Sequence, residues 1–383
     1  MTDAMALAMA AATPSVLRLF IDLRATRAWK HRPNNNRNQS ASDKAVSLLL
    51  CVHNDLDHLK AIWPLWRGQV FPSDWDAEWV VVNDGSSDGT RLWLEQQQRH
   101  DPKALVVVHH EKTRPGKKEA LAAGITAAHH DRLVLTDADC RPGEKWAYSM
   151  ANSIGNVPEG PAILLGFSLP NGGPWILHFD AVRIAWQYGT AAAMGGSYMG
   201  VGRNLAYRKS LWKTLGGFQD HLDLASGDDD LFVQSAAQKG HAIQTLATQD
   251  LRMANPTVPA SGWADGFRRK QRHLSTAPRY TPRILTNLVL DAWLDPLVAM
   301  GAAMGASGLL HNEGWIPVLS AGLVLLFRAV NLSSFVKDLG LPAKHGFRAI
   351  FLGPMRWGFL AVATLLNFTS SPTWTQRAPT SRS

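Results

Sequence analysis

The chain has 383 residues, which is enough for one large catalytic domain and an appendage. Its 39 Lys and Arg exceed its 31 Asp and Glu, and this net charge of +8 suits nucleic acid, an anionic membrane or phosphate-bearing substrates. Cys51 and Cys140 are the only cysteines, so zinc centres of the usual spacing are excluded and a reducing compartment is the simple inference.

The N-terminal region is predicted to form an anchoring helix. Residues 4–21 are mildly apolar but contain Pro14 and Arg18, and the segment lacks the basic start of a secretory signal. This composition favours an amphipathic surface helix over residues 1–30. Residues 31–44 are polar and rich in helix breakers, so they are expected to form a linker.

Four apolar runs of strand length follow the linker, and each ends in polar residues. Because strands alternate with turns and helical segments, the pattern predicts an α/β domain with a mostly parallel sheet, extending over residues 45–285. Ligands of such sheets gather beyond the carboxyl ends of the strands. The runs are residues 45–52, 78–82, 104–110 and 133–139.

The polar residues that follow these runs are candidates for one shared binding crevice. Asp55, Asp84, Lys117 and Asp139 all fall at the expected carboxyl edge of the sheet. Two of them also have an ordinary explanation, because Asp84 could cap the next helix and Lys117 could be a solvated surface residue. The sequence leaves both alternatives open.

Asp137-Ala138-Asp139 places two carboxylates one residue apart at the end of an apolar run. Mg²⁺ and Mn²⁺ take one or two protein carboxylates and fill their remaining positions with water and substrate phosphate oxygens. The spacing alone is weak evidence, since it also occurs at positions 55/57, 74/76 and 228/230. Its place after a strand, among other polar turns, makes it a candidate metal site.

Taken in order, these motifs resemble the nucleotide-sugar half of the family-two GT-A glycosyltransferases, whose fold is Rossmann-like. Later segments resemble the acceptor half of that family: Gly202 and Asn204 stand in its Gly-x-Asn segment, and Asp229 stands in its acidic motif. The matching segments are residues 46–55, 81–88, 116–121, 136–139, 202–209, 216–218 and 226–231.

The resemblance implies a nucleotide-diphosphate sugar donor, which is a UDP- or GDP-sugar. It implies that Asp139 holds Mg²⁺ or Mn²⁺, with Asp137 on the same metal or on the ribose. Asp84 and Asp55 are then suited to hydrogen-bond the base and the ribose, and Lys117 would favour the phosphates as a point charge. These five side chains form the expected donor site.

On the acceptor side, the resemblance implies that Asp229, next to Asp228, is the catalytic base. It would take the proton of an acceptor hydroxyl on the sugar face opposite the leaving group, so that the anomeric configuration is inverted. Gly202 and Asn204 are implied to bind the acceptor. The acidic run also has an ordinary explanation, because carboxylates are favoured where a helix begins.

A basic segment follows, in which Arg272 matches the Arg of the Gln-x-x-Arg-Trp motif of membrane-bound family members. The chain departs from that motif at two positions, since Arg269 replaces the Gln and His273 replaces the Trp. Arg272 could clamp the donor diphosphate, and the segment could equally face anionic lipid. We expect the first role for Arg272 and leave the second open.

From residue 286 to residue 370 the composition is apolar, which predicts two or three membrane helices followed by a polar tail over residues 371–383. The apolar segments are residues 294–310, 315–327 and 347–368. None reaches about 20 apolar residues without a charge, so a buried helical subdomain is the alternative. Lys and Arg flank the first two segments but are absent from residues 311–313 between them, which places the catalytic domain on the cytoplasmic side of the inner, cytoplasmic membrane.

Together these features predict a membrane-associated, metal-dependent, inverting glycosyltransferase that moves a sugar to a hydroxyl of a lipid-linked or glycan acceptor. A sugar-phosphate nucleotidyltransferase would use similar strand-end carboxylates but would release pyrophosphate. A basic membrane scaffold would bind no nucleotide at all. No nucleic acid partner is expected, because membrane and nucleotide together account for the positive charge.

Overall fold

The computed structural model describes residues 3–32, 44–154, 162–171, 175–245, 252–256, 270–307, 310–347, 356, 358, 360–362 and 364–365. The chain forms two compact units that interleave along the sequence, whereas the sequence suggested consecutive blocks. We call them the sheet unit and the helical unit. The sheet unit comprises Pro33–Gly172, Gly195–Val258 and Pro372–Ser383, and the helical unit comprises Met1–Arg32, Gly173–Met194 and Pro259–Ser371.

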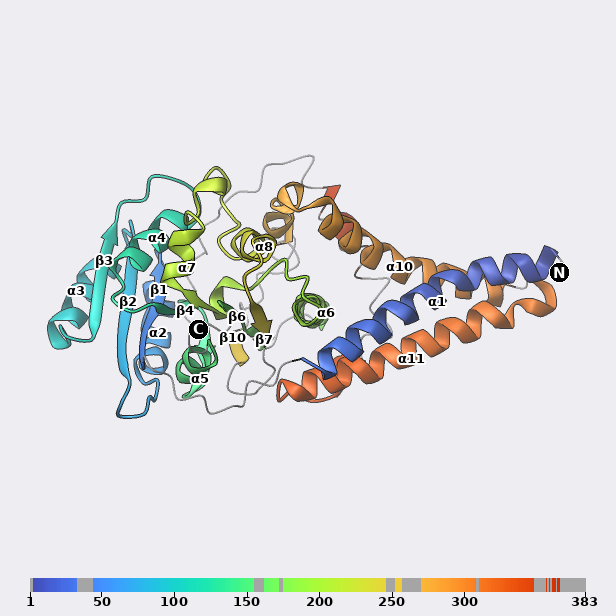
Figure 1. Cartoon of the computed structure of the whole chain (residues 1–383), viewed down its shortest axis with the longest axis horizontal. Helices are drawn as coiled ribbons and strands as arrows, with labels where there is room; N and C mark the ends of the chain where they lie inside the picture. The colour runs from blue at the N-terminus through green and yellow to red at the C-terminus, as the bar shows by residue number, and fades with distance from the viewer. Residues whose placement is uncertain are drawn as a thin grey trace. The chain divides into compact units, whose positions relative to one another are not determined.

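Among the described residues, the sheet unit contains seven strands in one sheet, and Figure 1 shows its arrangement. They are β1 (Ala45–Val52), β2 (Asp76–Asp84), β3 (Leu105–His110), β4 (Arg132–Asp137), β6 (Ile163–Leu165), β8 (Leu205–Arg208) and β9 (Ile243–Thr245). Their order is β3-β2-β1-β4-β8-β6-β9, and β8 alone runs antiparallel to its neighbours. The expectation of a mostly parallel α/β sheet is therefore confirmed.

The strand order reverses between β1 and β4. The chain builds β2 and β3 on one side of β1 and then returns to place β4 on the other side, so the loops that follow β1 and β4 diverge. Such a switch point is where open α/β sheets bind ligands. Cys51 of β1 pairs with Asp137 of β4 at this position, and Asp137 therefore lies at the switch point.

Helices pack closely on the parallel strands. The connecting helices are α2 (Leu56–Arg67), α3 (Thr90–His100), α4 (Lys118–Ala127) and α5 (Trp146–Ser153). Leu48 and Leu50 of β1 are fully buried in a core that also contains Trp66 and Trp146. A Cβ atom at Gly124 of α4 would lie 2.6 Å from a Val82 methyl carbon, so only glycine lets α4 approach β2 this closely. This contact fixes α4, whose first turn lies at the carboxyl edge of the sheet.

Short elements complete the sheet unit. A second sheet has the order β5-β10-β7 and consists of β5 (Arg141–Pro142), β10 (Arg252–Pro256) and β7 (Phe167–Asn171). The 3₁₀ turn η1 (Gly202–Asn204) precedes β8, α7 (Lys209–Thr214) follows it, and α8 (Asp230–Gln238) comes later. The beginnings of η1 and α8 carry the residues expected on the acceptor side.

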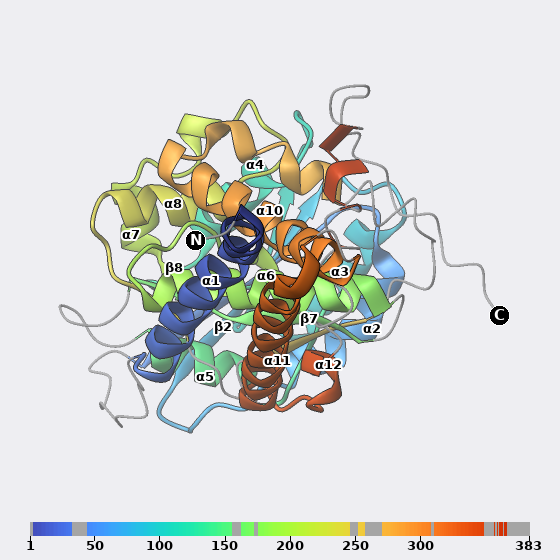
Figure 2. The same ribbon diagram turned by 90° about the vertical axis from the view of Figure 1, so that its right-hand side faces the viewer.

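The helical unit contains α1 (Asp3–Lys30), α6 (Trp175–Ala193), α10 (Pro282–Ala306), α11 (Trp315–Asp338) and α12 (Lys344–Phe347). Figures 1 and 2 show α1, α10 and α11 alongside one another. All three are long and apolar enough to cross a membrane. The prediction of apolar C-terminal helices is confirmed for α10 and α11, while residues 347–368 lie mostly outside the described part of the chain.

Helix α1 differs from the amphipathic surface helix that the sequence favoured. Its charged Arg18 and Asp22 are 1% and 3% exposed, whereas its apolar Val16 and Phe20 are 64% and 63% exposed. A helix lying on a water interface would expose the charges instead. The distribution is typical of a helix that turns its polar groups toward other helices and its apolar groups toward lipid.

The buried charges of the helical unit pair with one another across four helices. Arg18 of α1 forms ion pairs with Asp22 and with Asp291 of α10. Arg183 of α6 also pairs with Asp291, at 3.0 Å. Arg328 of α11 pairs with Asp22 at 3.4 Å and with Asp295 of α10. We call these six residues the helical-unit charge network; three are cations and three are anions.

Candidate active site

Lys117 and Asp137 meet beside the switch point of the sheet. Lys117 precedes α4, and its Nζ donates to Asp137 Oδ1 at 2.8 Å. The same ammonium lies 3.3 Å from Asp228 Oδ2, just before α8. Lys117 is therefore not a freely solvated surface residue, because its ammonium contacts both Asp137 and Asp228.

A hydrogen bond from Gly202 holds Asp229 beside Lys117 and Asp228. The backbone N–H of Gly202 donates to Asp229 Oδ2 at 2.9 Å, and the N–H of Asp230 donates to Asp229 Oδ1 at 2.8 Å. A Cβ atom at Gly202 would lie 3.3 to 3.4 Å from Asp228 Oδ2, Asp229 Oδ2 and Lys117 Nζ. Lys117, Asp137, Asp228, Asp229 and Gly202 thus form one cluster from four separate segments, and we call it the central cluster.

The charges of the central cluster perturb one another. Burial, together with the neighbouring carboxylates of Asp228 and Asp230, raises the pKa of Asp229 to about 7. Burial alone would lower the pKa of Lys117, but the carboxylates of Asp137 and Asp228 more than compensate and raise it well above its usual value. Asp229 therefore has the proton affinity that a base working near neutral pH requires. It also caps α8, as the alternative explanation supposed.

Asp139 follows β4, and the thiol of Cys140 donates to its Oδ1 at 3.5 Å. Arg203 lies within electrostatic range of it: burial lowers the pKa of Arg203, but Cys140, Asp139, Asp137 and Asp229 together raise it. Arg203 Nε also donates to Ser168 Oγ at 3.0 Å. The sequence analysis did not select Arg203, although a basic residue inside the Gly-x-Asn segment was a visible signal.

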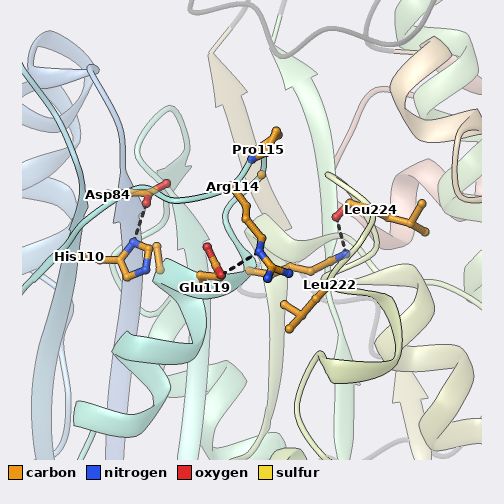
Figure 3. A pocket seen from close by; sticks show the side chains of 10 residues that line it. Asp84, His110, Arg114, Pro115, Glu119, Leu222 and Leu224 are labelled. Atoms are coloured by element: carbon orange, nitrogen blue, oxygen red, sulfur yellow. Dashed lines mark hydrogen bonds and ion pairs between the residues drawn. The ribbon is translucent and has the colours of Figure 1, made fainter.

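Asp84 ends β2 and is only 3% exposed. Its Oδ1 lies 2.9 Å from His110 Nδ1, and Lys112 forms an ion pair with its other oxygen. It does not cap α3, because Asp88 accepts the N–H of Thr90 at the start of that helix. Asp84 instead lines a small hollow beside the turn before α4 (Figure 3). The other residues lining it are His110, Arg114, Pro115, Gly116, Lys118, Glu119, Ala120, Leu222 and Leu224.

Cys51 lies near the end of β1, between the strands that carry Asp84 and Asp137. Burial raises the pKa of its thiol to about 12; the charge of Lys117 lowers this pKa, and the carboxylates of Asp84, Asp137 and Asp228 raise it. Lys117 and Asp137 are in direct contact, as the sequence analysis expected. That Asp84 shares one ligand site with them stays a prediction.

Asp55 lies just before α2, and its Oδ1 is 2.5 Å from His58 Nδ1. The loop that carries it is tied to the turn after β2, since the N–H of Asn54 donates to Ser86 Oγ and the N–H of Leu56 donates to Asp88 Oδ2, each at 3.0 Å. The structure thus joins Asp55 to the edge of β2. Its role toward a ribose or base stays a prediction.

The side chain of Asn204 lies inside the sheet unit, away from solvent. Its side chain is fully buried; Nδ2 donates to the carbonyl of Phe167, and Oδ1 accepts from Trp146 Nε1, both at 2.9 Å. A side chain with no exposed surface holds the turn η1 in place rather than presenting itself to an acceptor. Arg272 belongs to the helical unit, and its expected contact with a diphosphate stays a prediction.

Oxygen ligands for a divalent cation are available at Asp137 and Asp139. Among the described residues, no group of three or more His, Cys, Asp and Glu side chains is placed to hold a metal. This donor set fits Mg²⁺ or Mn²⁺, which can bind through one or two carboxylates when a diphosphate and water supply the other oxygens. A metal that needs a complete cage of protein ligands does not fit it.

Known proteins resemble this chain in sequence and in fold. Residues 47–215 match the model of the glycosyl transferase family 2, which begins in β1 and ends just after α7. The mannosyltransferase PcManGT from Pyrobaculum calidifontis, in complex with GDP-Man and Mn²⁺, is 19% identical; the match covers 95% of this chain and 99% of that chain with a TM-score of 0.59, so the two share a fold. S. aureus TarS 1-349 with UDP-GlcNAc is 16% identical over 73% of this chain and 90% of that chain, with a TM-score of 0.42. A search of curated proteins finds no match.

Proposed function

We propose, on the premise that residues 47–215 belong to the glycosyl transferase family 2, that this chain is a membrane-associated, metal-dependent, inverting glycosyltransferase. It would move a sugar from a nucleotide-diphosphate sugar to a hydroxyl of a lipid-linked or glycan acceptor. The observation that carries the proposal is the central cluster. It sets a carboxylate with a pKa of about 7 beside a half-buried lysine and a strand-end Asp-x-Asp motif.

On the donor side, the nucleotide diphosphate would bind where the strands end. Asp139 and Asp137 would hold Mg²⁺ or Mn²⁺, which neutralises negative charge on the departing diphosphate. Lys117 is a permanently charged neighbour of the same carboxylate and would attract the phosphates. Asp84 and Asp55 would hydrogen-bond the base and the ribose, while Arg272 would contribute a further cation to the diphosphate.

On the acceptor side, Asp229 would act as the base. Its Oδ1 and Oδ2 are oriented by the N–H groups of Asp230 and Gly202, so the carboxylate is fixed before a substrate arrives. Asp229 would accept the hydroxyl proton as the oxygen attacks the anomeric carbon from the face opposite the diphosphate, which gives inversion. Asp228 would keep the proton affinity of this base high.

Replacing the proposed base or metal ligand provides the test. Asp229→Asn and Asp139→Ala should each lower the rate of sugar transfer by about 10²-fold or more, because a base contributes about 10²- to 10⁴-fold. GDP-mannose and UDP-GlcNAc with Mn²⁺ are the first donors to try, with a membrane lipid extract as acceptor. Asp74→Asn is the matched control, since Asp74 belongs to another Asp-x-Asp spacing and pairs with Lys44 at an exposed site.

The identity of the released product separates this proposal from the other classes. A glycosyltransferase releases a nucleoside diphosphate, whereas pyrophosphate formed from a nucleoside triphosphate would mean a nucleotidyltransferase. Calorimetry with GDP or UDP and Mn²⁺ tests the membrane scaffold, which binds neither. Full transfer activity in Asp229→Asn, with the variant folded, would contradict the assigned base.

A further inference from the structure

The turn before α4 contacts the loop that leads to the base at three successive residues. Gly116 has φ +95°, and a Cβ atom there would lie 2.4 Å from the carbonyl oxygen of Ala225, so the two backbones touch. Lys117 lies 3.3 Å from Asp228 Oδ2. Lys118 Nζ donates to the carbonyl oxygens of His221 at 2.5 Å and of Leu224 at 2.9 Å. One short segment of the donor side therefore holds residues 221–228.

Lys118 differs from its neighbour Lys117 in what it contacts. Its ammonium is directed at backbone carbonyls of the 221–224 segment, and the residue is only 4% exposed. Burying a lysine is costly unless its donors are satisfied. Burial lowers the pKa of Lys118 overall, and the nearby carboxylates, Asp228 first among them, offset only part of this effect. The buried ammonium of Lys118 therefore holds the 221–224 loop by two hydrogen bonds and places a positive charge near the acidic residues Asp228 to Asp230.

The loop is fixed again at its other end. Asp229 Oδ2 accepts the N–H of Gly202, so the segment from His221 to Asp229 is anchored by Lys118 at its start and by Gly202 at its end. Gly227, between these anchors, has φ +104°. If the first anchor is lost, the loop can relax and the carboxylate of Asp229 moves away from the position that Gly202 sets.

We propose that Lys118 is a positioning residue for the base: it locks the 221–227 loop to the donor-side turn, so that Asp229 faces the sugar bound beside Lys117. The inference rests on the proposed function. If Lys118 had only a structural role, its replacement would lower the stability of the protein and leave kcat of the folded enzyme unchanged. A positioning residue would affect turnover while leaving nucleotide binding in place, because the donor-side groups Asp84, Asp137 and Asp139 are not carried by this loop.

The test compares Lys118→Met with Lys209→Met. Lys209 is a matched control, because its Nζ also donates to two backbone carbonyls, those of Thr126 at 3.0 Å and Ala128 at 2.5 Å, at the other end of α4. Lys118→Met should lower kcat by ~10- to 100-fold with GDP-mannose or UDP-GlcNAc, Mn²⁺ and a lipid extract, because a displacement of about 1 Å can cost 10²-fold. The affinity for GDP or UDP should stay within about threefold, since those contacts persist.

The pH profile supplies a second readout. Loss of a cation near Asp229 raises the pKa of that carboxyl, so the acidic limb of kcat should move to higher pH in Lys118→Met. Lys118→Arg keeps the charge and should return the limb toward its original position. Lys209→Met should keep the kcat and the pH profile of the wild type, since Lys209 is remote from the acidic run.

Two results would overturn the assignment: a kcat for Lys118→Met equal to that of Lys209→Met, or a loss of nucleotide affinity that parallels the loss of kcat. If Lys118→Met does not fold, Gly116→Ala decides, because its methyl group must displace the Ala225 carbonyl; an unchanged kcat there would reject the positioning role. A wild-type protein without transfer activity would overturn the proposed function as well, whereas an active wild type with an unaffected Lys118→Met overturns this inference alone.

Discussion

In the proposed function Asp229 would combine two roles that usually exclude each other, because a helix-capping carboxylate is normally ionised and a weak base. Here its Oδ1 caps α8 while burial and two adjacent carboxylates raise its pKa to about 7. The hydrogen bond from Gly202 and the charge of Lys117 act in the opposite direction and keep the pKa from rising further. These opposing effects leave the carboxyl with a pKa near neutral pH, as the proposed base requires.

This balance predicts how the rate should depend on pH. A base must be ionised to act, so transfer should rise with pH and level off above about 7. Asp228→Asn removes the negative charge that contributes most after burial, so the pKa of Asp229 should fall and the acidic limb should move to lower pH. Measuring kcat of the wild type and of Asp228→Asn between pH 5 and pH 9 checks the position of this limb. A limb that stays in place, or that moves to higher pH, would show that Asp228 does not tune the base.

The sequence identified the members of the central cluster but not Lys118, which holds the loop that leads to Asp229. Asp137, Lys117, Asp228 and Asp229 were selected because their side chains have obvious chemistry at strand or helix ends. The partners of Lys118 are backbone carbonyls more than a hundred positions away, and no side-chain pattern signals them. Asn204 was assigned to the acceptor from its motif, and only its burial reveals a structural environment.

Among the elements, the parallel strands were the most predictable. The apolar runs at 45–52 and 78–82 correspond to β1 and to the centre of β2, because strands buried on both faces consist of continuous apolar residues. The short strands β5, β7 and β10 were not predicted. Two to five residues carry too little periodicity, and these strands exist because distant segments happen to pair.

Helix α1 shows a different limit. Its sequence contains both apolar and charged residues, but it does not say whether the apolar side chains meet protein or lipid. The structure resolves this, since the charges face α10 and α11 and the apolar residues are exposed. Gly301 of α10 makes the contact close, because a Cβ atom there would lie 2.2 Å from the carbonyl oxygen of Ala11.

The charge network therefore predicts a strong effect of a single substitution in α1. Arg18→Leu leaves Asp22 and Asp291 buried with fewer cations, and breaking a buried ion pair from one side costs about 3 to 5 kcal/mol. The melting temperature of the protein in detergent should fall clearly. Arg24→Leu is the control, because Arg24 is exposed on the same helix. Equal melting temperatures for the two variants would mean that the network contributes little to stability.

For the whole molecule, the two units differ in where their apolar side chains lie. The sheet unit buries its apolar residues in a core under the strands, whereas α1, α10 and α11 leave large apolar side chains exposed. Such exposed residues are expected to meet lipid. They include Phe20 of α1, Trp293 and Met300 of α10, and Leu319, Leu323 and Leu326 of α11.

The three helices also have a defined direction relative to one another. Trp29, near the end of α1, donates to Asp338 at the end of α11 at 3.0 Å, so the carboxyl ends of these two helices lie together. Basic residues gather at those ends, where Arg27 and Lys30 close α1 and Lys337 closes α11. The connection between α10 and α11 contains no Lys or Arg at residues 311–313. The positive-inside rule then predicts that this connection lies on the non-cytoplasmic side of the membrane and that the basic ends lie in the cytoplasm.

Cysteine labelling tests that topology. Asn312 is exposed in the connection before α11, and Ser210 is exposed in the sheet unit, so Asn312→Cys and Ser210→Cys give one reporter on each side. A membrane-impermeant maleimide should label Asn312→Cys in intact cells and should label Ser210→Cys only after the cells are opened. The native Cys140 is buried and Cys51 is partly so, which keeps the background low. Labelling of Ser210→Cys in intact cells would place the sheet unit outside the cytoplasm, where cytoplasmic nucleotide-sugars could not reach it.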